Sequence, residues 1–305
     1  MAMSIGLHRE FSNTSTTPFT MEIRRRAWWT LFVLLSSAQL TVGRCPASLI
    51  GVTVQPPSNI RDIDLAVDMD RPAPEFDGPT VTSSLIAQLK LATIANEIQG
   101  ELLTYQVPKS ANAASLDDKI SHWMAELPSY FNPKSTPPAW FEQPKFILLW
   151  RSYHLRIILN RPFLFQSVAN DLDLDSDNQY VRSCLQTADI CADSICDFFD
   201  THTQYKRGFA WYATYWLITA SFVHATCLAY APVHSSAEQW KSQLKRAANV
   251  LGTLGSAHLM ANRARRLLER LLGMSTPLMV SYRVMKTRVH LAYLQLGHVK
   301  KPVAS

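Results

Sequence analysis

The stretch EIRRRAWWTLFVLLSSAQLTVGR, residues 22–44, decides the fold class that we predict for this chain. Three arginines and two tryptophans lead into a run without formal charge that ends at Gly43. On a helix, apolar side chains spaced by three and four residues would form one face: Trp28, Leu31, Leu35, Ala38 and Val42. Most of the remaining surface would also be apolar, and such a helix belongs in a protein interior or a membrane. Gly43 favours a helix end, and Pro46 keeps the helix from resuming.

Helical periodicity recurs in the rest of the chain. With 10 glycines and 47% hydrophobic residues among 305, the composition favours helices and allows a large core. The pattern predicts further helices over residues 82–105, 116–127, 146–159, 181–200, 208–231 and 238–272, the last as one helix or a pair. Residues 1–10 are expected to end another helix, 11–20 to form a linker and 128–144 a connector. Because residues 45–80 are rich in proline and aspartate, we predict an all-α fold with an irregular segment there.

Five short motifs follow one another in a recognisable order. GLHR lies at residues 6–9, RRRAWWTLF at 24–32, GRCP at 43–46, DID at 62–64 and YHLRIILNRPFL at 153–164. Their order and spacing resemble the fungal transcription factor regulatory domain, the middle homology region of zinc binuclear cluster transcription factors. The resemblance spans residues 1–272.

The chain departs from the family pattern at two points. The family carries an Asp-Arg pair after the middle of the Trp-Trp helix, where this chain has Leu35 and Ser36. The proline of the family's Gly-Arg-Pro motif is displaced by one residue, to Pro46. Whatever the Asp-Arg pair does in the family is therefore not expected of these positions.

The resemblance implies a large multi-helix regulatory domain at residues 1–274 that lacks the family's first helices, and an unassigned tail at 275–305. It implies an effector-responsive module that acts in the nucleus and controls transcription through a DNA-binding head outside this chain. The partners it implies are DNA through that head only, a small-molecule effector or a co-regulator protein, and a second copy in a dimer, but no membrane. Because the family has no fixed ligand, no residue is assigned to an effector site.

The cysteines exclude the family's zinc cluster from these residues. A binuclear cluster needs six thiolates, because two metals with four sulfur ligands each share two of them. This chain has five cysteines at other spacings: Cys45, Cys184, Cys191, Cys196 and Cys227. An odd count without a C-x-x-C motif fits a reducing compartment rather than a disulfide framework. We therefore expect no metal and no cofactor in this chain, and assign zinc to the head.

Two groups of aspartates invite a metal-binding interpretation. An EF-hand loop starting at Asp171, with Asp173, Asp175 and Asp177, would place Ser176 and Arg182 where glycine and a chelating glutamate are needed. We therefore expect a solvated loop. On the next helix, four aspartates share one face, opposite the cysteines: Asp189, Asp193, Asp197 and Asp200. With no histidine among them, we expect that face to be solvated and the cysteines to be buried as small hydrophobic side chains.

Charge is distributed unevenly along the chain. Residues 1–205 carry 16 basic and 22 acidic side chains, whereas residues 206–305 carry 14 basic and 2 acidic side chains. A basic region of this kind can bind nucleic acid or another acidic partner. Because its arginines lie on amphipathic helix patterns, we prefer to interpret it as a solvated helix face.

Two other function classes compete with a regulatory module. The apolar segments 27–42 and 209–230 could belong to a membrane-anchored or secretory-pathway protein whose translation starts at Met21. Against this, Thr214 and His224 inside the second segment would be costly in lipid, and the family resemblance accounts for the first. An enzyme is disfavoured, because the sequence contains no nucleophile elbow, HExxH, Walker A or dinucleotide-binding motif.

Overall fold

The computed structural model describes residues 2–11, 16–175, 177–256 and 259–273. These residues form eight α-helices, two short 3-10 helices, η1 (Asp62–Asp64) and η2 (Ser129–Phe131), and no strand, so the prediction of an all-α fold is confirmed. The α-helices are α1 (Pro18–Val42), α2 (Ser83–Thr104), α3 (Ser110–Ala125), α4 (Ala139–Ala169), α5 (Gln179–Thr201), α6 (Arg207–Tyr230), α7 (Ala237–Leu254) and α8 (Leu259–Gly273). The tail predicted at 275–305 lies outside the described residues.

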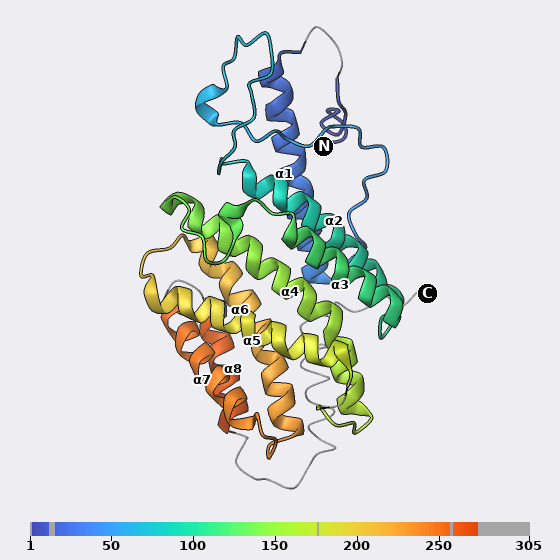
Figure 1. Ribbon diagram of the computed structural model, residues 1–305, viewed down its shortest axis with the longest axis vertical. Helices are drawn as coiled ribbons and strands as arrows, with labels where there is room; N and C mark the ends of the chain where they lie inside the picture. The colour runs from blue at the N-terminus through green and yellow to red at the C-terminus, as the bar shows by residue number, and fades with distance from the viewer. Residues whose placement is uncertain (1, 12–15, 176, 257–258, 274–305) are drawn as a thin grey trace, which may run out of the picture.

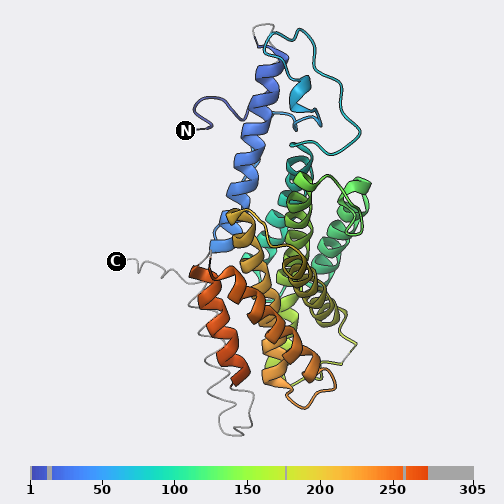
Figure 2. The same cartoon turned by 90° about the vertical axis from the view of Figure 1, so that its left-hand side faces the viewer.

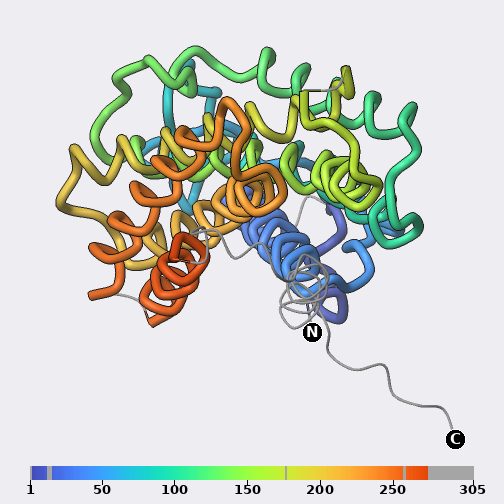
Figure 3. The backbone as a smooth tube through the Cα atoms, turned by 90° about the horizontal axis from the view of Figure 1, so that it is seen from below, coloured from blue at the N-terminus to red at the C-terminus, as the bar shows by residue number. Residues whose placement is uncertain are grey.

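Helix α4 lies at the centre of an elongated molecule (Figure 1). It packs against α5 and α6 on one side and against α2 and α3 on the other, while α7 and α8 cover α6. Most of the buried apolar side chains form one cluster that runs through α2 to α8. Helix α1 packs chiefly on α2 and shares a smaller cluster with it. Helices α1 and α8 lie on the same side of the bundle (Figures 2 and 3).

Helix α1 begins earlier than the sequence predicted. The Thr17 side chain accepts a hydrogen bond from the Thr20 amide at 3.2 Å, and Pro18 occupies the first turn. Proline is favourable there, because its ring presets the helical φ and the amide it lacks would have no helical partner. Residues 18–20 are therefore helical rather than part of a linker. At the other end, Gly43 takes a left-handed φ of 63°, as expected for the predicted stop.

The buried face of α1 differs from the predicted one. The buried side chains along the helix are Met21, Glu22, Trp28, Trp29, Phe32, Val33 and Ser36. Leu31 and Leu35, which the sequence placed on the buried face, are 43% and 46% exposed. Helix α1 lies at the edge of the molecule, with its N-terminal half extending beyond α2 (Figure 2). Because the helix is apolar on nearly every side, its periodicity could not identify the face that α2 covers.

Prolines lie inside α4, where the sequence predicted helix boundaries. The helix runs through Pro144 and Pro162 instead of extending only from 146 to 159. An internal proline removes one helical hydrogen bond and costs about 3 kcal/mol. Past Pro162 the helix buries Phe163 and Leu164, at 5% and 0% exposure. Burial of such side chains contributes roughly 1.5–3 kcal/mol each, so the longer helix offsets the cost of the proline.

Two other predicted boundaries need correction, and the structure decides between two alternatives that the sequence left open at a third place. Residues 2–9 form successive turns, with Gly6 at a left-handed φ of 65°, rather than the end of a helix. Helix α3 begins at Ser110, six residues before the predicted start at 116. The long pattern over 238–272 is a pair of helices, α7 and α8, of which α7 ends at Leu254. The Asn262 side chain of α8 donates to the Gly255 carbonyl at 2.7 Å and closes the turn between them.

Helix α5 separates its cysteines from its aspartates, as predicted. Cys184, Cys191 and Cys196 are completely buried, and burial raises the pKa of Cys184 to about 12. The aspartates on the opposite face are partly exposed but are not merely solvated. Arg246 of α7 forms ion pairs with three of them: Asp193, Asp197 and Asp200. These hydrogen bonds raise the pKa of Arg246. One basic residue of the C-terminal region therefore binds α7 to α5.

Helix α6 carries the apolar segment 209–230. Its polar side chains Thr214, Ser221 and His224 are buried, and His224 Nε2 lies 2.9 Å from Asp189 Oδ1 on α5. No described helix, α1 and α6 included, is long and apolar enough to cross a membrane.

Two ionisable side chains of α4 are buried around the start of the YHLRIILNRPFL motif, Arg151 two residues before it and His154 within it. Arg151 is 5% exposed and donates to Gln88 Oε1 at 3.0 Å. His154 is 4% exposed, and its ring lies 5.1 Å from that of Tyr215. Burial, together with the charges of Arg161 and Arg151, lowers the pKa of His154 to about 3. Folding therefore keeps His154 neutral well below the pH at which a solvated histidine takes up a proton.

Replacing His154 should reduce the sensitivity of the fold to acid. Below a pH of about 6.5 the unfolded chain binds a proton at His154 that the folded chain excludes, so stability falls by up to about 1.4 kcal/mol per pH unit towards pH 3. In His154→Phe this contribution to the slope should disappear in urea unfolding measured between pH 7 and 5. His122→Gln, at an exposed histidine, is the matched control. Identical slopes for His154→Phe and the parent chain would contradict the assignment.

Candidate functional site

The arginines of the RRRAWW motif hold different parts of the chain against α1. Arg24 Nη2 donates to the Gly6 carbonyl at 2.6 Å. Arg25 forms an ion pair with Glu10, which also accepts a hydrogen bond from the Gln55 amide at 2.9 Å. Although burial opposes the change, these bonds hold the pKa of Glu10 below its ordinary value. The GLHR motif and the start of the irregular segment are thus bound to one helix through charged side chains.

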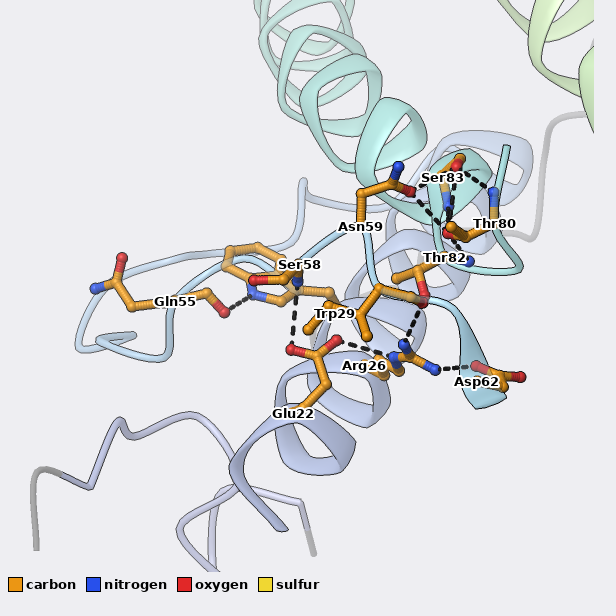
Figure 4. A network of polar contacts seen from close by, with 11 residues as sticks. Glu22, Arg26, Trp29, Gln55, Ser58, Asn59, Asp62, Thr80, Thr82 and Ser83 are labelled. Atoms are coloured by element: carbon orange, nitrogen blue, oxygen red, sulfur yellow. Dashed lines mark hydrogen bonds and ion pairs between the residues drawn. The ribbon is translucent and has the colours of Figure 1, made fainter. Parts of the chain in front are cut away.

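Arg26 binds the irregular segment itself. Its Nε lies 2.9 Å from Glu22 Oε1 on the preceding turn, and its Nη1 lies 2.7 Å from Asp62 Oδ1. Its Nη2 donates to the Ile60 carbonyl at 3.2 Å, and Glu22 Oε2 accepts from the Ser58 amide at 3.3 Å. Figure 4 shows this guanidinium group between α1 and the segment. The DID motif therefore supplies a counter-charge for the arginine motif.

The two tryptophans complete this attachment. Trp29 Nε1 donates to the Gln55 carbonyl at 2.8 Å, so the indole is both buried and hydrogen-bonded (Figure 4). The Trp28 ring lies 5.8 Å from the ring of His8 in the GLHR motif. Val54 packs in the same apolar cluster. Four of the five family-like motifs therefore meet on or next to α1, counting Gly43 at its end.

Asn59 organises the second half of the irregular segment. Its Nδ2 donates to the carbonyls of Phe76 and Gly78, at 2.6 and 2.9 Å, and the Phe76 amide donates back to the Asn59 carbonyl at 2.8 Å. Its Oδ1 accepts from the hydroxyls of Thr80 and Ser83, at 2.7 and 2.6 Å. Figure 4 shows the side chain directed at the start of α2. One amide group therefore joins residues 76–78 to the first turn of α2.

A cavity of about 350 Å³ lies beside this junction, and we call it the Asn59 cavity. Residues 75–78 form one wall, the first turns of α2 a second, and the end of α3 with residues 127–131 the third. Trp123 and Phe131 at its apolar base are 3% and 1% exposed. A cavity of this size falls within the range of small-molecule sites. A second cavity, of about 240 Å³, lies between α1 and the irregular segment.

The lining of the Asn59 cavity combines aromatic rings with charged groups. Trp123 Nε1 donates to the Ala87 carbonyl at 3.1 Å, so the indole presents no unpaired donor. Tyr130 and Phe131 lie with their ring centroids 5.0 Å apart. The charged side chains of the lining are Glu75, Asp77, Lys90 and Glu126. A hollow that combines an apolar base with a few charged groups has the composition of a small-ligand site.

A cluster elsewhere, at Asp173, Asp175 and His234, brings three potential metal-ligating atoms within 4.8 Å of one another, the one such group found in the described residues. His234 Nδ1 accepts a hydrogen bond from the Ser236 amide at 3.0 Å, so in the neutral ring the proton sits on Nε2, which lies 3.2 Å from Asp175 Oδ2. A metal at Nε2 would force that proton to Nδ1, against the amide. His234 Nε2 makes an ion-pair contact with Asp175 but no hydrogen bond, and the absence of a metal stays a prediction.

Sequence analysis assigned no residue to the Asn59 cavity. One local signal was present, because Thr80 and Ser83 have the spacing of a capping box ahead of an apolar run. In the structure, the Thr80 amide donates to Ser83 Oγ at 2.7 Å, and Thr80 Oγ1 accepts from the Ser83 amide at 3.2 Å. Asn59 gave no such signal, because its partners lie 17 to 24 residues away across irregular backbone.

Comparison with known proteins places the chain among fungal transcription regulators by similarity. It is 27% identical over 277 residues to the lactose regulatory protein LAC9 of Kluyveromyces lactis, covering 86% of this chain and 29% of that protein. A putative transcriptional regulatory protein of Schizosaccharomyces pombe is 23% identical over 202 residues, covering 61% of this chain and 24% of its own length. The aurofusarin cluster transcription factor aurR2 of Gibberella zeae is 35% identical over 79 residues, which cover 24% of this chain and 12% of that protein.

The resemblance that the motifs indicated is thereby confirmed. The chain spans less than a third of the length of these relatives. No family model matches the chain, and no solved structure matches it.

Replacing Asn59 by alanine should release the wall of the Asn59 cavity while leaving the helical bundle folded. The loss of several hydrogen bonds, each contributing about 1 kcal/mol, should speed cleavage after Glu75 by low concentrations of a glutamate-specific endopeptidase about tenfold or more. Mass spectrometry of the fragments would measure this rate, and circular dichroism would confirm that the helices remain.

Gln55→Ala is the matched control for this experiment. The Gln55 side-chain amide reaches only the Thr53 carbonyl, at 3.4 Å, and the backbone carbonyl that binds Trp29 is retained. Equal cleavage rates in the Asn59 and Gln55 variants would show that Asn59 does not hold the wall.

Proposed function

We propose that this chain is the effector-responsive regulatory module of a fungal transcription factor of the zinc-cluster type. The observation that carries the proposal is the match to the lactose regulatory protein over 86% of this chain. The aligned residues therefore include most of the helical domain rather than one short motif. Transcription regulators of two further fungi are similar to parts of the same chain, which supports regulation of transcription as the shared role.

In this proposal, a DNA-binding head outside the chain carries the zinc and contacts DNA, and the chain acts on that head in the nucleus. The sequence supports this division, because five cysteines cannot supply the six thiolates of a binuclear cluster. The burial of Cys184, Cys191, Cys196 and Cys227 in the helical core as free thiols supports this division. We assign the chain no catalytic reaction.

The two parts of the fold suit different tasks in such a module. Helices α4 to α8 share one apolar core and would serve as a stable body. The irregular segment is held largely by side-chain bonds from α1 and Asn59, so a bound effector or co-regulator protein could shift its position. A ligand shifts such an equilibrium by the difference between its affinities for the two states. A dimer is compatible with the proposal and would change none of these roles.

Fusion of the chain to an unrelated DNA-binding domain tests the regulatory role. The fusion should change the output of a reporter gene severalfold relative to the DNA-binding domain alone at equal protein level. Trp29→Ala should abolish this change, because loss of a buried aromatic side chain costs about 3–5 kcal/mol. Trp140→Ala, at a tryptophan that is 54% exposed, is the matched control. Equal reporter output with and without the chain would count against the proposal.

The isolated chain should not select a DNA sequence. Its residues 206–305 carry 14 basic and 2 acidic side chains, so weak binding to phosphates that is lost as salt increases is expected. Selection from a random oligonucleotide pool at physiological salt should enrich no motif. Recovery of one motif would mean that the chain itself reads DNA and that no separate head is needed.

A further inference from the structure

We infer that the Asn59 cavity binds a small organic cation, namely an amine that carries an apolar body. The inference rests on the proposed function only in treating occupancy as a regulatory signal. Binding itself follows from the cavity's shape, its aromatic base and the sign of the charges around it. Each of these features is fixed by contacts already described.

The base of the cavity suits the apolar body of such a ligand. Trp123 and Phe131 are buried, and Ile86 of α2 adds an aliphatic side chain to the lining. Because Trp123 has its indole N–H bonded to the Ala87 carbonyl, the ring offers only its apolar surface. Removal of a ligand's hydrocarbon from water against these side chains favours binding.

The charges around the cavity favour a cation over an anion. Three carboxylates, Glu75, Asp77 and Glu126, belong to the lining, against the single ammonium group of Lys90. A hollow lined mainly by charges of one sign concentrates ions of the opposite sign. An acidic ligand of the same size would meet three like charges.

Lys90 does not cancel this excess. Its Nζ lies 3.6 Å from Glu126 Oε2, but the two side chains are 64% and 49% exposed. Exposed pairs of this kind contribute little stability, so a ligand amine can take the place of Lys90 beside Glu126. His122 Nε2 is also near Glu126, at 3.2 Å from Oε1.

The aromatic wall already binds a cation. The Arg61 guanidinium lies 5.0 Å from the centroid of the Phe76 ring, and its own charge is balanced by Asp64 at 2.7 Å. Aromatic faces attract cations through their quadrupole. With Phe76 in one wall, Tyr130 in another and Trp123 at the base, the cavity presents rings on more than one side.

Three compounds with one apolar body and different charges would test the inference: 4-phenylbutylamine, 4-phenylbutanol and 4-phenylbutanoate. The full chain is titrated with each by isothermal calorimetry. The amine should bind tightest and the carboxylate weakest. In the double variant D77N/E126Q, amine affinity should fall about tenfold, which corresponds to 1.4 kcal/mol, while the affinity of the alcohol is unchanged. Lys90→Gln should strengthen amine binding.

Glu97→Gln is the matched control, because Glu97 is an exposed carboxylate of α2 that pairs with Lys119 and is not part of the lining. It should leave amine affinity unchanged. The inference would be overturned if the carboxylate bound as tightly as the amine, if the double variant bound the amine like the parent chain, or if the amine showed no saturable binding at millimolar concentration. The reporter experiment uses no ligand. If the chain changed reporter output but did not bind the amine, the proposed ligand class would be wrong while the regulatory role would still stand.

Discussion

The buried ion pair of Arg26 with Glu22, together with the hydrogen bonds of both side chains to residues 58–60, is the interaction that holds the irregular segment against α1. The Glu22 side chain is 4% exposed and that of Arg26 is 17% exposed, so both charges are largely removed from water. Taking one partner from a buried pair typically costs about 3–5 kcal/mol, because the other charge is left without compensation. The same two side chains bind the Ile60 carbonyl and the Ser58 amide, so they fix residues 58–60 relative to α1, whereas the pair with Asp62, which is 59% exposed, contributes little.

The order of contacts along the segment follows from this attachment. Residues 55–60 run along α1, where Trp29 and Arg26 bind their carbonyls. Asn59 then points away from α1, toward α2, and gathers residues 76–83 around its amide (Figure 4). Helices α4 to α8 are held mainly by apolar packing, whereas the irregular segment is held mainly by directional polar bonds, which open more readily when solvent competes for them. Stability and responsiveness are therefore located in different parts of one chain.

The sequence predicted the elements of this fold better than their faces and ends. Gly43 identified the end of α1, because a left-handed stop is a local requirement of the backbone. Pro162 suggested an end that tertiary packing overrode, since Phe163 and Leu164 gain more by burial than the missing hydrogen bond costs. Leu35 was placed on the wrong face because an almost wholly apolar helix contains no information about which neighbour covers it.

The candidate site was less accessible to sequence reasoning for a related reason. Helix faces can be derived from periodicity, but the Asn59 cavity is built from irregular backbone and from the ends of three elements. The contacts of Arg26 with Asp62 and of Asn59 with Ser83 span 36 and 24 residues, and no local rule relates such positions. The motifs showed that these regions matter together, and only the structure shows how they meet.

The wall at residues 75–78 has a consequence for how such proteins diverge. Its side chains contribute no helical hydrogen bonds and lie outside the apolar core, so replacements at Glu75 or Asp77 can accumulate without unfolding the bundle. Gly78 is the exception, since a Cβ there would lie 2.5 Å from Phe76 Cε1 and displace the ring. A lineage that keeps Asn59 and this glycine can therefore inherit the scaffold unchanged while its chemical selectivity drifts, one exposed residue at a time.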